Sequence, residues 1–348
     1  MEHHAKIFVA GHRGLVGSGI VRELQKQGYT NIITRTRSEL NLLSSEAVNA
    51  FFSAEKPEYV VIAAAKVGGI MANRNFPVEF LTENLTIQNN LIVAAQKNNV
   101  RKLLFLGSSC IYPKYTPQPM AEGSLLTGIL EPTNDAYAIA KIAGIKLCDA
   151  MNRQYKTNFI SAMPTNMYGP GDNFDLQNSH VLPAMIRKFH LAKLALAGDW
   201  KAIAKDQNRY GAIPADLMTQ LESNVGFVKL WGTGTPKREF LYSDDLAAAC
   251  VYLLQNIDAN QLDSTLNDDF NPCSLVNVGF GSDVSIKELA EIVQKTVRYE
   301  GDIVWDSTKP DGTPRKLMDS AKIHGLGWKP IVSLEEGIQK AYDWYLNH

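Results

Sequence analysis

The sequence contains little cysteine, and its thiols are widely separated. The four cysteines among 348 residues are Cys110, Cys148, Cys250 and Cys273, and no two of them form a C-x-x-C pair. Closely spaced cysteines are typical of structural zinc sites and of redox dithiols, so their absence suggests neither, and we expect no bound metal. Reduced, scattered thiols are typical of a cytosolic protein, and we therefore expect a cytoplasmic location.

Long apolar runs and an excess of one charge are also absent. The apolar residues 7–10 lead directly into a glycine, whereas a secretory signal has an apolar region of roughly 7–15 residues. A second run, residues 60–65, ends at Lys66 and is too short to span a bilayer. The formal net charge of -1 predicts no bulk attraction to nucleic acid or to a membrane.

The first half of the sequence alternates short β-branched runs with longer helical patterns. This alternation is typical of a parallel sheet with helices on both faces, so we predict an α/β fold with a doubly wound, Rossmann-type sheet. The predicted strands lie at 6–10, 31–34, 59–62, 102–107 and 158–163. The predicted helices lie at 15–27, 45–55, 77–98 and 137–155.

The chain length predicts two domains, at roughly 150 residues for each. We expect residues 1–165 and about 240–272 to form a nucleotide-binding domain. Gly, Pro and Asn become frequent around residues 166–178, where the chain is expected to leave the sheet. Residues 166–239 and 273–348, with approximate boundaries, are then expected to form a smaller α/β substrate-binding domain.

A glycine motif, Gly11-x-x-Gly14-x-x-Gly17, follows the first predicted strand and opens the first predicted helix. Small residues in this place let the backbone approach a pyrophosphate, and the helix N-terminus offers free N–H groups to an anion. An ordinary tight turn explains the motif about equally well when the motif stands alone. The motif therefore needs support from the rest of the chain.

Arginines stand where an NAD site usually places an acidic residue for the ribose 2′-hydroxyl. The second predicted strand ends in Thr34-Arg35-Thr36-Arg37, and Arg13 lies inside the glycine motif. Guanidinium groups match a 2′-phosphate in charge and geometry, so we predict NADP(H) as the cofactor rather than NAD(H). For one of Arg35 and Arg37, a solvated surface charge is an equally good explanation.

The pair Tyr137-x-x-x-Lys141 lies at the start of a predicted helix, and its spacing places both side chains on one face. A cation beside a phenol favours the phenolate, so we expect Lys141 to bring the pKa of Tyr137 closer to neutral. Tyr137 then exchanges a proton with a carbonyl that is being reduced. Ser108, after the strand at 102–107, is expected to hold the substrate oxygen, with Ser109 as the neighbouring alternative.

Several stretches resemble the GDP-L-fucose synthase family of extended short-chain dehydrogenases/reductases, and the likeness extends over nearly the whole chain. They are GHRGLVG (11–17), RSELNL (37–42), AAKVGGI (64–70), LGSSCIYP (106–113), PTNMYGP (164–170) and REFL (238–241). The block around Cys110 is the most specific, because most relatives lack a cysteine there.

The resemblance implies an NADPH-dependent conversion of GDP-4-keto-6-deoxy-D-mannose to GDP-L-fucose, by epimerisation at C3 and C5 followed by reduction at C4. It implies that Cys110 is the base and His180 the acid of the epimerisation. The structural alternatives are a buried, inert thiol for Cys110 and a satisfied helix-capping histidine for His180. Ser108, Tyr137 and Lys141 complete the expected catalytic set.

The family pattern also implies the residues that bind the cofactor. They are Gly11, His12, Arg13, Gly14, Leu15, Val16, Gly17, Arg37, Leu40, Asn41, Leu42, Leu106, Gly107, Ser108, Ser109, Lys141, Pro164, Thr165, Asn166, Met167 and His180.

A GDP-sugar is the expected partner, and the resemblance places its contacts in the second half of the chain. Lys188 and Arg238, with Arg187 adjacent, are expected near the pyrophosphate or the sugar. Trp231 is expected to cover the sugar or base, and Asp283 to accept hydrogen bonds from ribose hydroxyls. A solvated charge for Arg187 or Lys188, and a core position for Trp231, are the plainer alternatives.

Between His190 and Phe227 the chain is longer than the family pattern by roughly thirty residues, a length that is usually functional or separately folded. We expect an inserted helical segment at about 191–226, with helices at 194–205 and 213–221, that acts as a lid or an oligomer contact.

The resemblance further implies a homodimer formed through the helices at 77–98 and 137–155. Two other functions remain open at this point. One is a related GDP-4-keto-deoxyhexose epimerase/reductase, such as a GDP-L-colitose synthase, which inverts only C5. The other is a protein that senses NADP without turnover, which the intact Tyr137–Lys141 pair makes a poor fit.

Overall fold

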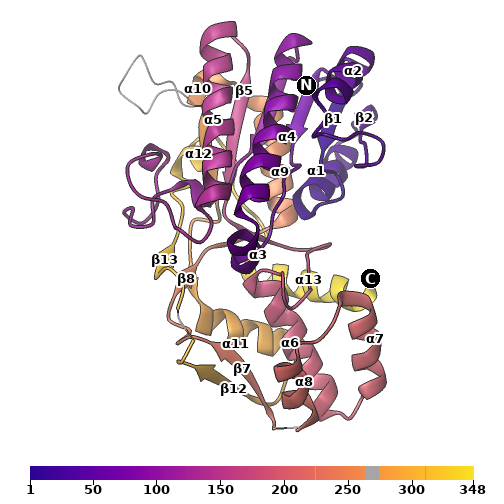
Figure 1. Ribbon diagram of the computed structural model, residues 1–348, viewed down its shortest axis with the longest axis vertical. Helices are drawn as coiled ribbons and strands as arrows, with labels where there is room; N and C mark the ends of the chain where they lie inside the picture. Colours follow the sequence, from indigo (N-terminus) through magenta and orange to yellow (C-terminus); the bar gives the residue numbers. More distant parts are fainter. Residues whose placement is uncertain (224, 263–273, 310) are drawn as a thin grey trace. The chain divides into compact units, whose positions relative to one another are not determined.

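The computed structural model describes residues 1–223, 225–262, 274–309 and 311–348, and Cys273 lies outside this part. The chain folds into two compact units. Unit 1 comprises Met1–Met167, Phe240–Gly281 and Leu317–Ile331, and unit 2 comprises Tyr168–Glu239, Ser282–Lys316 and Val332–His348. Figure 1 shows the elements of both units in sequence colours.

Unit 1 contains a six-stranded parallel sheet with the strand order β10-β5-β4-β3-β1-β2. Its apolar runs, such as YVVI in β3 and KLLFL in β4, are buried on both faces, as expected for a parallel sheet. The strands are β1 (Ile7–Ala10), β2 (Ile32–Ile33), β3 (Tyr59–Ile62), β4 (Lys102–Leu106), β5 (Phe159–Pro164) and β10 (Leu275–Val278).

Helices cover both faces of this sheet. Alternate side chains of β1 enter two separate cores: Phe8 packs with α2, α4 and α5, whereas Ile7 packs with α1 and α9. The predicted α/β fold with a doubly wound sheet is therefore confirmed, and α4 and α5 run side by side in Figure 1. The helices are α1 (Leu15–Lys26), α2 (Ser45–Glu55), α3 (Ile70–Asn75), α4 (Pro77–Lys97), α5 (Asp135–Tyr155), α9 (Ser243–Asn256), α10 (Ala259–Leu262) and α12 (Ala321–Gly325), with 3-10 turns η1 (Ser109–Ile111) and η2 (Glu122–Ser124).

Two segments lie in a different unit from the one expected. The sequence pattern assigned residues 273–348 to the second domain, but β10 and Leu317–Ile331 belong to unit 1. The reason is long-range packing: β10 pairs with β5, and Ile323 and Trp328 are buried in the core under α1 and α9. No local sequence pattern predicts these long-range contacts.

The described part of unit 2, which omits residues 224 and 310, contains five helices and short strands. β11, β8 and β13 form a three-stranded sheet, and β12 pairs in parallel with β7. The helices are α6 (Val181–Leu196), α7 (Trp200–Tyr210), α8 (Ala215–Glu222), α11 (Ile286–Val297) and α13 (Leu334–Asn347). The strands are β7 (Phe227–Trp231), β8 (Lys237–Arg238), β11 (Val284–Ser285), β12 (Asp302–Asp306) and β13 (Arg315–Lys316). A further two-stranded sheet, of β6 (Asn166–Tyr168) and β9 (Phe240–Tyr242), belongs to unit 1 except for Tyr168.

The prediction of one helix at 194–205 is wrong. α6 ends at Leu196, and Gly198 adopts a positive φ of 70°, a conformation that interrupts a helix. A new helix, α7, then begins, and Asp199 caps it by accepting a hydrogen bond from the Ala202 N–H at 3.0 Å. The segment therefore forms two helices meeting at a glycine turn, followed by α8.

None of the helices in the described ranges is both long enough and apolar enough to cross a membrane.

Candidate active site

The glycine motif lies at the point in unit 1 where the strand order reverses, between β1 and β3. Gly11 has a φ of 89°, and a Cβ there would lie 2.6 Å from the backbone nitrogen of Ala64. A Cβ on Gly17 would collide with the Gly11 carbonyl oxygen. Ligands of doubly wound sheets bind at this switch point, beyond the carboxyl ends of the strands.

The start of α1 is open to an anion. Its N-cap, Gly14, has no side chain to satisfy the first N–H groups, and the first turn contains no acidic residue. His12 Nδ1 is buried with no hydrogen-bond partner among the described residues, whereas Leu15 and Val16 are half-buried. These features fit a dinucleotide pyrophosphate bound by backbone N–H groups.

The arginines after β2 have different environments. Arg35 donates to Glu55 Oε1 at 2.6 Å and to the Thr34 carbonyl at 2.9 Å, so it is a structural ion pair. Arg37 and Arg13 are exposed, and neither has a carboxylate within ion-pair distance in the described ranges. Both are available to bind an anion.

The segment after Arg37 is held in place by short-range bonds. Glu39 accepts hydrogen bonds from Thr36, which lower its pKa, and the charges of Arg35 and Arg13 lower it further. Asn41 Oδ1 accepts from the Leu43 N–H at 3.1 Å. The carbonyl of Leu42 accepts from Asn90 at 2.9 Å, and Leu40 is buried.

Tyr137 and Lys141 lie in the first turns of α5. Lys141 is buried, and its Nζ donates to the Leu106 carbonyl at 2.7 Å. The same ammonium lies 4.7 Å from the ring centroid of Phe105 and 5.8 Å from that of Tyr137. Lys141 therefore links α5 to the end of β4, where Gly107 and the predicted serines begin.

Burial is the main influence on the pKa of both side chains. It raises the pKa of Tyr137, to which the Cys110 thiol adds, and it lowers the pKa of Lys141 to about 8. The prediction that Lys141 brings the pKa of Tyr137 toward neutral is therefore wrong in this structure, because desolvation disfavours the phenolate. Tyr137 is a protonated phenol at neutral pH, the state that a proton donor to a carbonyl requires.

Ser108 and Cys110 lie just after the end of β4. Ser108 Oγ accepts a hydrogen bond from the Cys110 N–H at 3.4 Å, which closes the η1 turn, and Ser109 is half-buried. Cys110 is buried, with 6% of its surface exposed. Burial fits both a structural thiol and a shielded base, and the η1 turn that contains Cys110 packs against α5, which carries Tyr137 and Lys141.

The end of β5 contributes the last predicted contacts of unit 1. The Thr165 N–H donates to the Val278 carbonyl of β10 at 3.2 Å, while Pro164, Asn166 and Met167 are half-buried. Since all six strands are parallel, these residues lie at the same edge of the sheet as the glycine motif and Ser108. All the predicted cofactor-binding residues except His180 therefore belong to unit 1.

His180 belongs to unit 2 and is the N-cap residue of α6. Its side chain makes no capping hydrogen bond, and it is exposed. Desolvation lowers its pKa. The alternative of a satisfied capping histidine is therefore wrong.

Lys188 and Arg238 are half-buried cations of unit 2 without an ion pair to any described carboxylate. Burial lowers the pKa of both, and Asp216 partly offsets this for Lys188. A desolvated, unpaired cation favours a bound anion, which fits a diphosphate. Arg187, in contrast, is fully buried and paired with Asp206 at 2.8 Å, so both a diphosphate contact and a solvated charge are wrong for it.

Trp231 and Asp283, the two other predicted substrate contacts, each lie near a cation of unit 2. Trp231 is 65% exposed at the end of β7, with Lys309 Nζ 5.5 Å from its ring centroid, so a core position is wrong. Asp283 receives two hydrogen bonds from Arg315, at 2.5 and 3.2 Å. Arg315 and Lys309 belong to no motif, and only the folded chain places them beside these residues.

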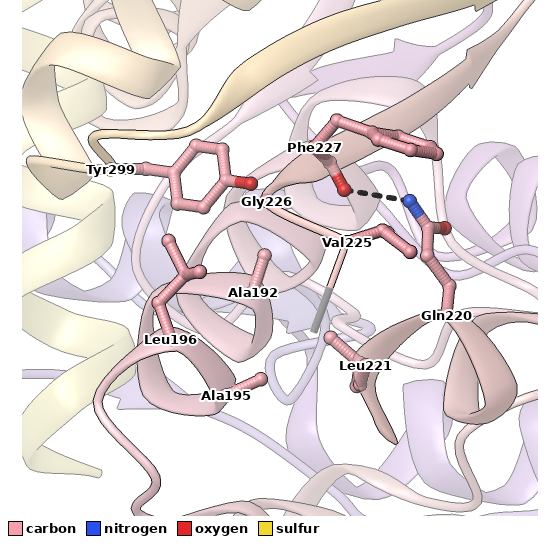
Figure 2. Close-up of a pocket in the computed structure, with 9 residues that line it drawn as sticks. All are labelled: Ala192, Ala195, Leu196, Gln220, Leu221, Val225, Gly226, Phe227 and Tyr299. Atoms are coloured by element: carbon pink, nitrogen blue, oxygen red, sulfur yellow. Dashed lines mark hydrogen bonds between the residues drawn. The ribbon is translucent and has the colours of Figure 1, made fainter. Parts of the chain in front are cut away.

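The structure also contains a small cavity in unit 2, of about 10 Å³. Figure 2 shows its lining, which comes from α6, α8, residues 225–227 leading into β7, and Tyr299 after α11. This volume holds at most about one water molecule. It is a packing defect and not a sugar-nucleotide site.

Comparison with known proteins gives full-length matches. The model of the NAD dependent epimerase/dehydratase family matches residues 7–267. GDP-L-fucose synthase 1 of Arabidopsis thaliana is 53% identical over 347 residues, which cover 100% of this chain and 95% of that protein. The GDP-L-fucose synthase of Escherichia coli (strain K12) is 49% identical over 344 residues, which cover 99% of this chain and 97% of that protein.

A solved structure also matches over nearly the whole chain. The GDP-D-glycero-L-gluco-heptose synthase of Campylobacter jejuni, crystallised in the presence of NADPH, has a TM-score of 0.92, 41% identity and 99% coverage of both chains. The GDP-L-colitose synthase of Yersinia pseudotuberculosis is 38% identical over 347 residues, covering 98% of each chain. A nicotinamide cofactor follows for this chain.

The pKa of Lys141 predicts a basic limb in the pH profile of carbonyl reduction. Lys141 is cationic below about pH 8 and neutral above it. In the role predicted for the pair, this charge stabilises the phenolate left when Tyr137 donates its proton. We expect the turnover number at saturating cofactor to fall by about tenfold per pH unit above this pKa. Lys141→Arg, whose guanidinium stays charged, should lack this limb in its residual activity. A wild-type profile that stays flat from about pH 7 to 10 contradicts the role.

Proposed function

The chain belongs to the NAD dependent epimerase/dehydratase family, and from this premise we propose that it converts GDP-4-keto-6-deoxy-D-mannose to GDP-L-fucose with NADPH. The relatives named GDP-L-fucose synthase support the substrate and product. One observation supports the proposal for this chain: the η1 turn that contains Cys110 packs against α5, which carries Tyr137 and Lys141, at the edge of the sheet that holds the glycine motif.

Epimerisation uses the acidity of the carbons next to the ketone. The C4 carbonyl stabilises the enolate formed when C3 or C5 loses its proton, so one carbonyl activates both centres. We assign Cys110 as the base and His180 as the acid that returns a proton to the opposite face. Shielding from water helps this step, because it keeps the thiolate poorly solvated and reactive.

Reduction follows on the same carbonyl. When bound, the reduced nicotinamide supplies the hydride to C4. Ser108 holds the ketone oxygen by a hydrogen bond, and Tyr137 donates its phenolic proton to the developing alkoxide. Lys141 stabilises the resulting phenolate through its charge.

We assign the GDP moiety to the unpaired cations of unit 2. Lys188 and Arg238 neutralise the diphosphate, because their burial without carboxylate partners leaves them in need of an anion. The exposed face of Trp231 is available to stack on the base or sugar. Asp283, oriented by Arg315, has lone pairs left for ribose hydroxyls.

The epimerisation role of Cys110 has a direct test. We expect the wild type to incorporate deuterium from solvent at both C3 and C5 of the keto-sugar, and Cys110→Ser to lower this exchange by at least about 100-fold while it still binds NADPH. Cys250→Ala, on the opposite face of the sheet, is the matched control and should exchange normally. Unchanged exchange in Cys110→Ser removes the thiol from the mechanism, and exchange at C5 alone in the wild type favours the colitose-type reaction.

We infer that Arg37 gives the protein its preference for NADPH over NADH. It is exposed and unpaired, so we expect Arg37→Gln to raise the KM for NADPH by on the order of tenfold and to leave the KM for NADH nearly unchanged. Arg35→Gln is the control, because Arg35 is already bound by Glu55 and should affect the preference much less. Equal KM values for both cofactors in the wild type contradict the assignment.

We further propose a cytoplasmic homodimer that associates through α4 and α5. Both helices present apolar side chains to solvent, with Val78 67% exposed on α4 and Ile139 49% exposed on α5. Exposed apolar side chains on neighbouring helices are typical of a covered surface.

A charge on this surface should separate the protomers. We expect Ile139→Glu to shift the sedimentation coefficient from that of a dimer to that of a monomer at micromolar protein, since it places an uncompensated carboxylate in the interface. Ile331→Glu is the control, because Ile331 is 87% exposed and lies outside α4 and α5. A wild type that sediments as a monomer contradicts the proposed dimer.

A further inference from the structure

Arg187 of α6 is a fully buried guanidinium whose hydrogen bonds join separate parts of unit 2. Its Nε donates to Asp206 Oδ1 at 2.8 Å. Its Nη atoms donate to the carbonyls of Phe174 at 3.2 Å, Tyr210 at 2.8 Å and Gly211 at 2.6 Å. Two of these acceptors lie at the C-terminal end of α7, where the helix dipole favours a cation. The buried positive charge of Arg187 is therefore balanced by one carboxylate and three backbone carbonyls.

Asp206 extends the network to the C-terminal helix. Its second oxygen accepts a hydrogen bond from the Tyr345 hydroxyl of α13. The Tyr345 ring stacks on Tyr210, with centroids 4.6 Å apart, and packs against Phe174 at 4.8 Å. The Tyr210 hydroxyl in turn donates to the Tyr345 carbonyl at 2.6 Å. One buried ion pair therefore fixes α6, α7, α13 and the loop at Phe174 to one another.

The loop at Phe174 leads to His180. Asp175 Oδ1 accepts from the N–H groups of Gln177 at 3.1 Å and Asn178 at 3.0 Å, and the Ser179 N–H donates to the Asp175 carbonyl at 2.9 Å. The chain from Phe174 to the start of α6 is therefore a bonded turn. Arg187 bonds to the Phe174 carbonyl at the start of this turn. It also belongs to α6, the helix that begins where the turn ends.

α8 braces the other side of α6. Leu217 and Leu221 are buried, and Gln220 Nε2 donates to the Phe227 carbonyl at the start of β7 at 2.7 Å. Figure 2 shows this bond, with Leu221 facing Ala192 and Ala195 of α6. α8 therefore connects α6 to the strand that ends at Trp231.

We propose that α7 and α8 of the inserted segment act as a brace, and that Arg187 and Asp206 are positioning residues for His180 and Lys188. This inference rests on the proposed function, in which these two side chains meet the sugar and the diphosphate. A buried ion pair is often less stable than apolar residues of the same size, but its hydrogen bonds fix orientation. Apolar packing alone would hold α6 and α7 together without fixing the turn that precedes His180.

The test combines variants of the network with two independent measurements. Arg187→Gln, Arg187→Lys, Asp206→Asn and Tyr345→Phe remove different parts of it. Tyr342→Phe is the matched control on α13, because Tyr342 bonds His190 instead. The first measurement is hydrogen–deuterium exchange of the backbone amides at 174–181. The second is deuterium incorporation at C3 and C5 of GDP-4-keto-6-deoxy-D-mannose, with NADPH affinity measured alongside.

We expect Arg187→Gln and Asp206→Asn to lose amide protection at 174–181 and to lower sugar exchange by about tenfold or more, because small displacements of an acid are costly. NADPH affinity should change much less than sugar exchange does, since all the predicted cofactor residues except His180 lie in unit 1. Arg187→Lys should recover part of the loss, Tyr345→Phe should show a smaller effect, and Tyr342→Phe should show none.

Folded Asp206→Asn protein with wild-type amide protection and wild-type sugar exchange overturns the proposal. If Arg187→Gln does not fold, Asp206→Asn and Tyr345→Phe decide the question. If the wild type exchanges no deuterium into the sugar, the proposed function fails. The amide measurement still tests the brace in that case, so the two failures are distinguishable.

Discussion

A buried ammonium organises the chemistry of unit 1. Lys141 Nζ donates to the Leu106 carbonyl at 2.7 Å, and this bond joins the first turns of α5 to the carboxyl end of β4. The bond fixes Tyr137, four residues earlier on the helix, relative to Ser108 and Cys110, which follow the strand. Burial lowers the pKa of Lys141, and the Cys110 thiol partly offsets this effect. The predicted catalytic groups are therefore placed relative to one another by the bond between Lys141 and Leu106.

In unit 2, some cations form ion pairs with carboxylates and have a structural role, whereas others form no ion pair and are available to a ligand. Arg187 and Arg315 each meet a carboxylate, Asp206 and Asp283. Lys188 and Arg238 are desolvated but have no such partner in the described ranges. The same distinction holds in unit 1, where Arg35 is bound by Glu55 and Arg37 is exposed. An anionic sugar nucleotide and a phosphorylated cofactor are what these unpaired charges would bind.

The sequence predicts the sheet and the cofactor edge because both follow from local rules. Apolar runs such as IFVA and YVVI are buried on both faces, and Gly11 is required where a Cβ would meet Ala64. Local rules fail where distant segments decide the outcome. Arg187 and Lys188 are neighbours in sequence and look alike, yet only the folded chain brings Asp206 to one of them. The pKa of Tyr137 depends on how deeply α5 is buried, which the spacing to Lys141 does not reveal.

In the proposed reaction, one carbonyl serves two epimerisations and one reduction. This is tested by the configuration of the product formed from GDP-4-keto-6-deoxy-D-mannose and NADPH, determined by NMR from the proton couplings around the sugar ring. We expect the galacto-configured 6-deoxy-L-sugar of GDP-L-fucose, with C3 and C5 both inverted and C4 reduced. A reduced D-sugar that keeps its original configuration at C3 and C5 would contradict it and leave the protein a simple ketone reductase.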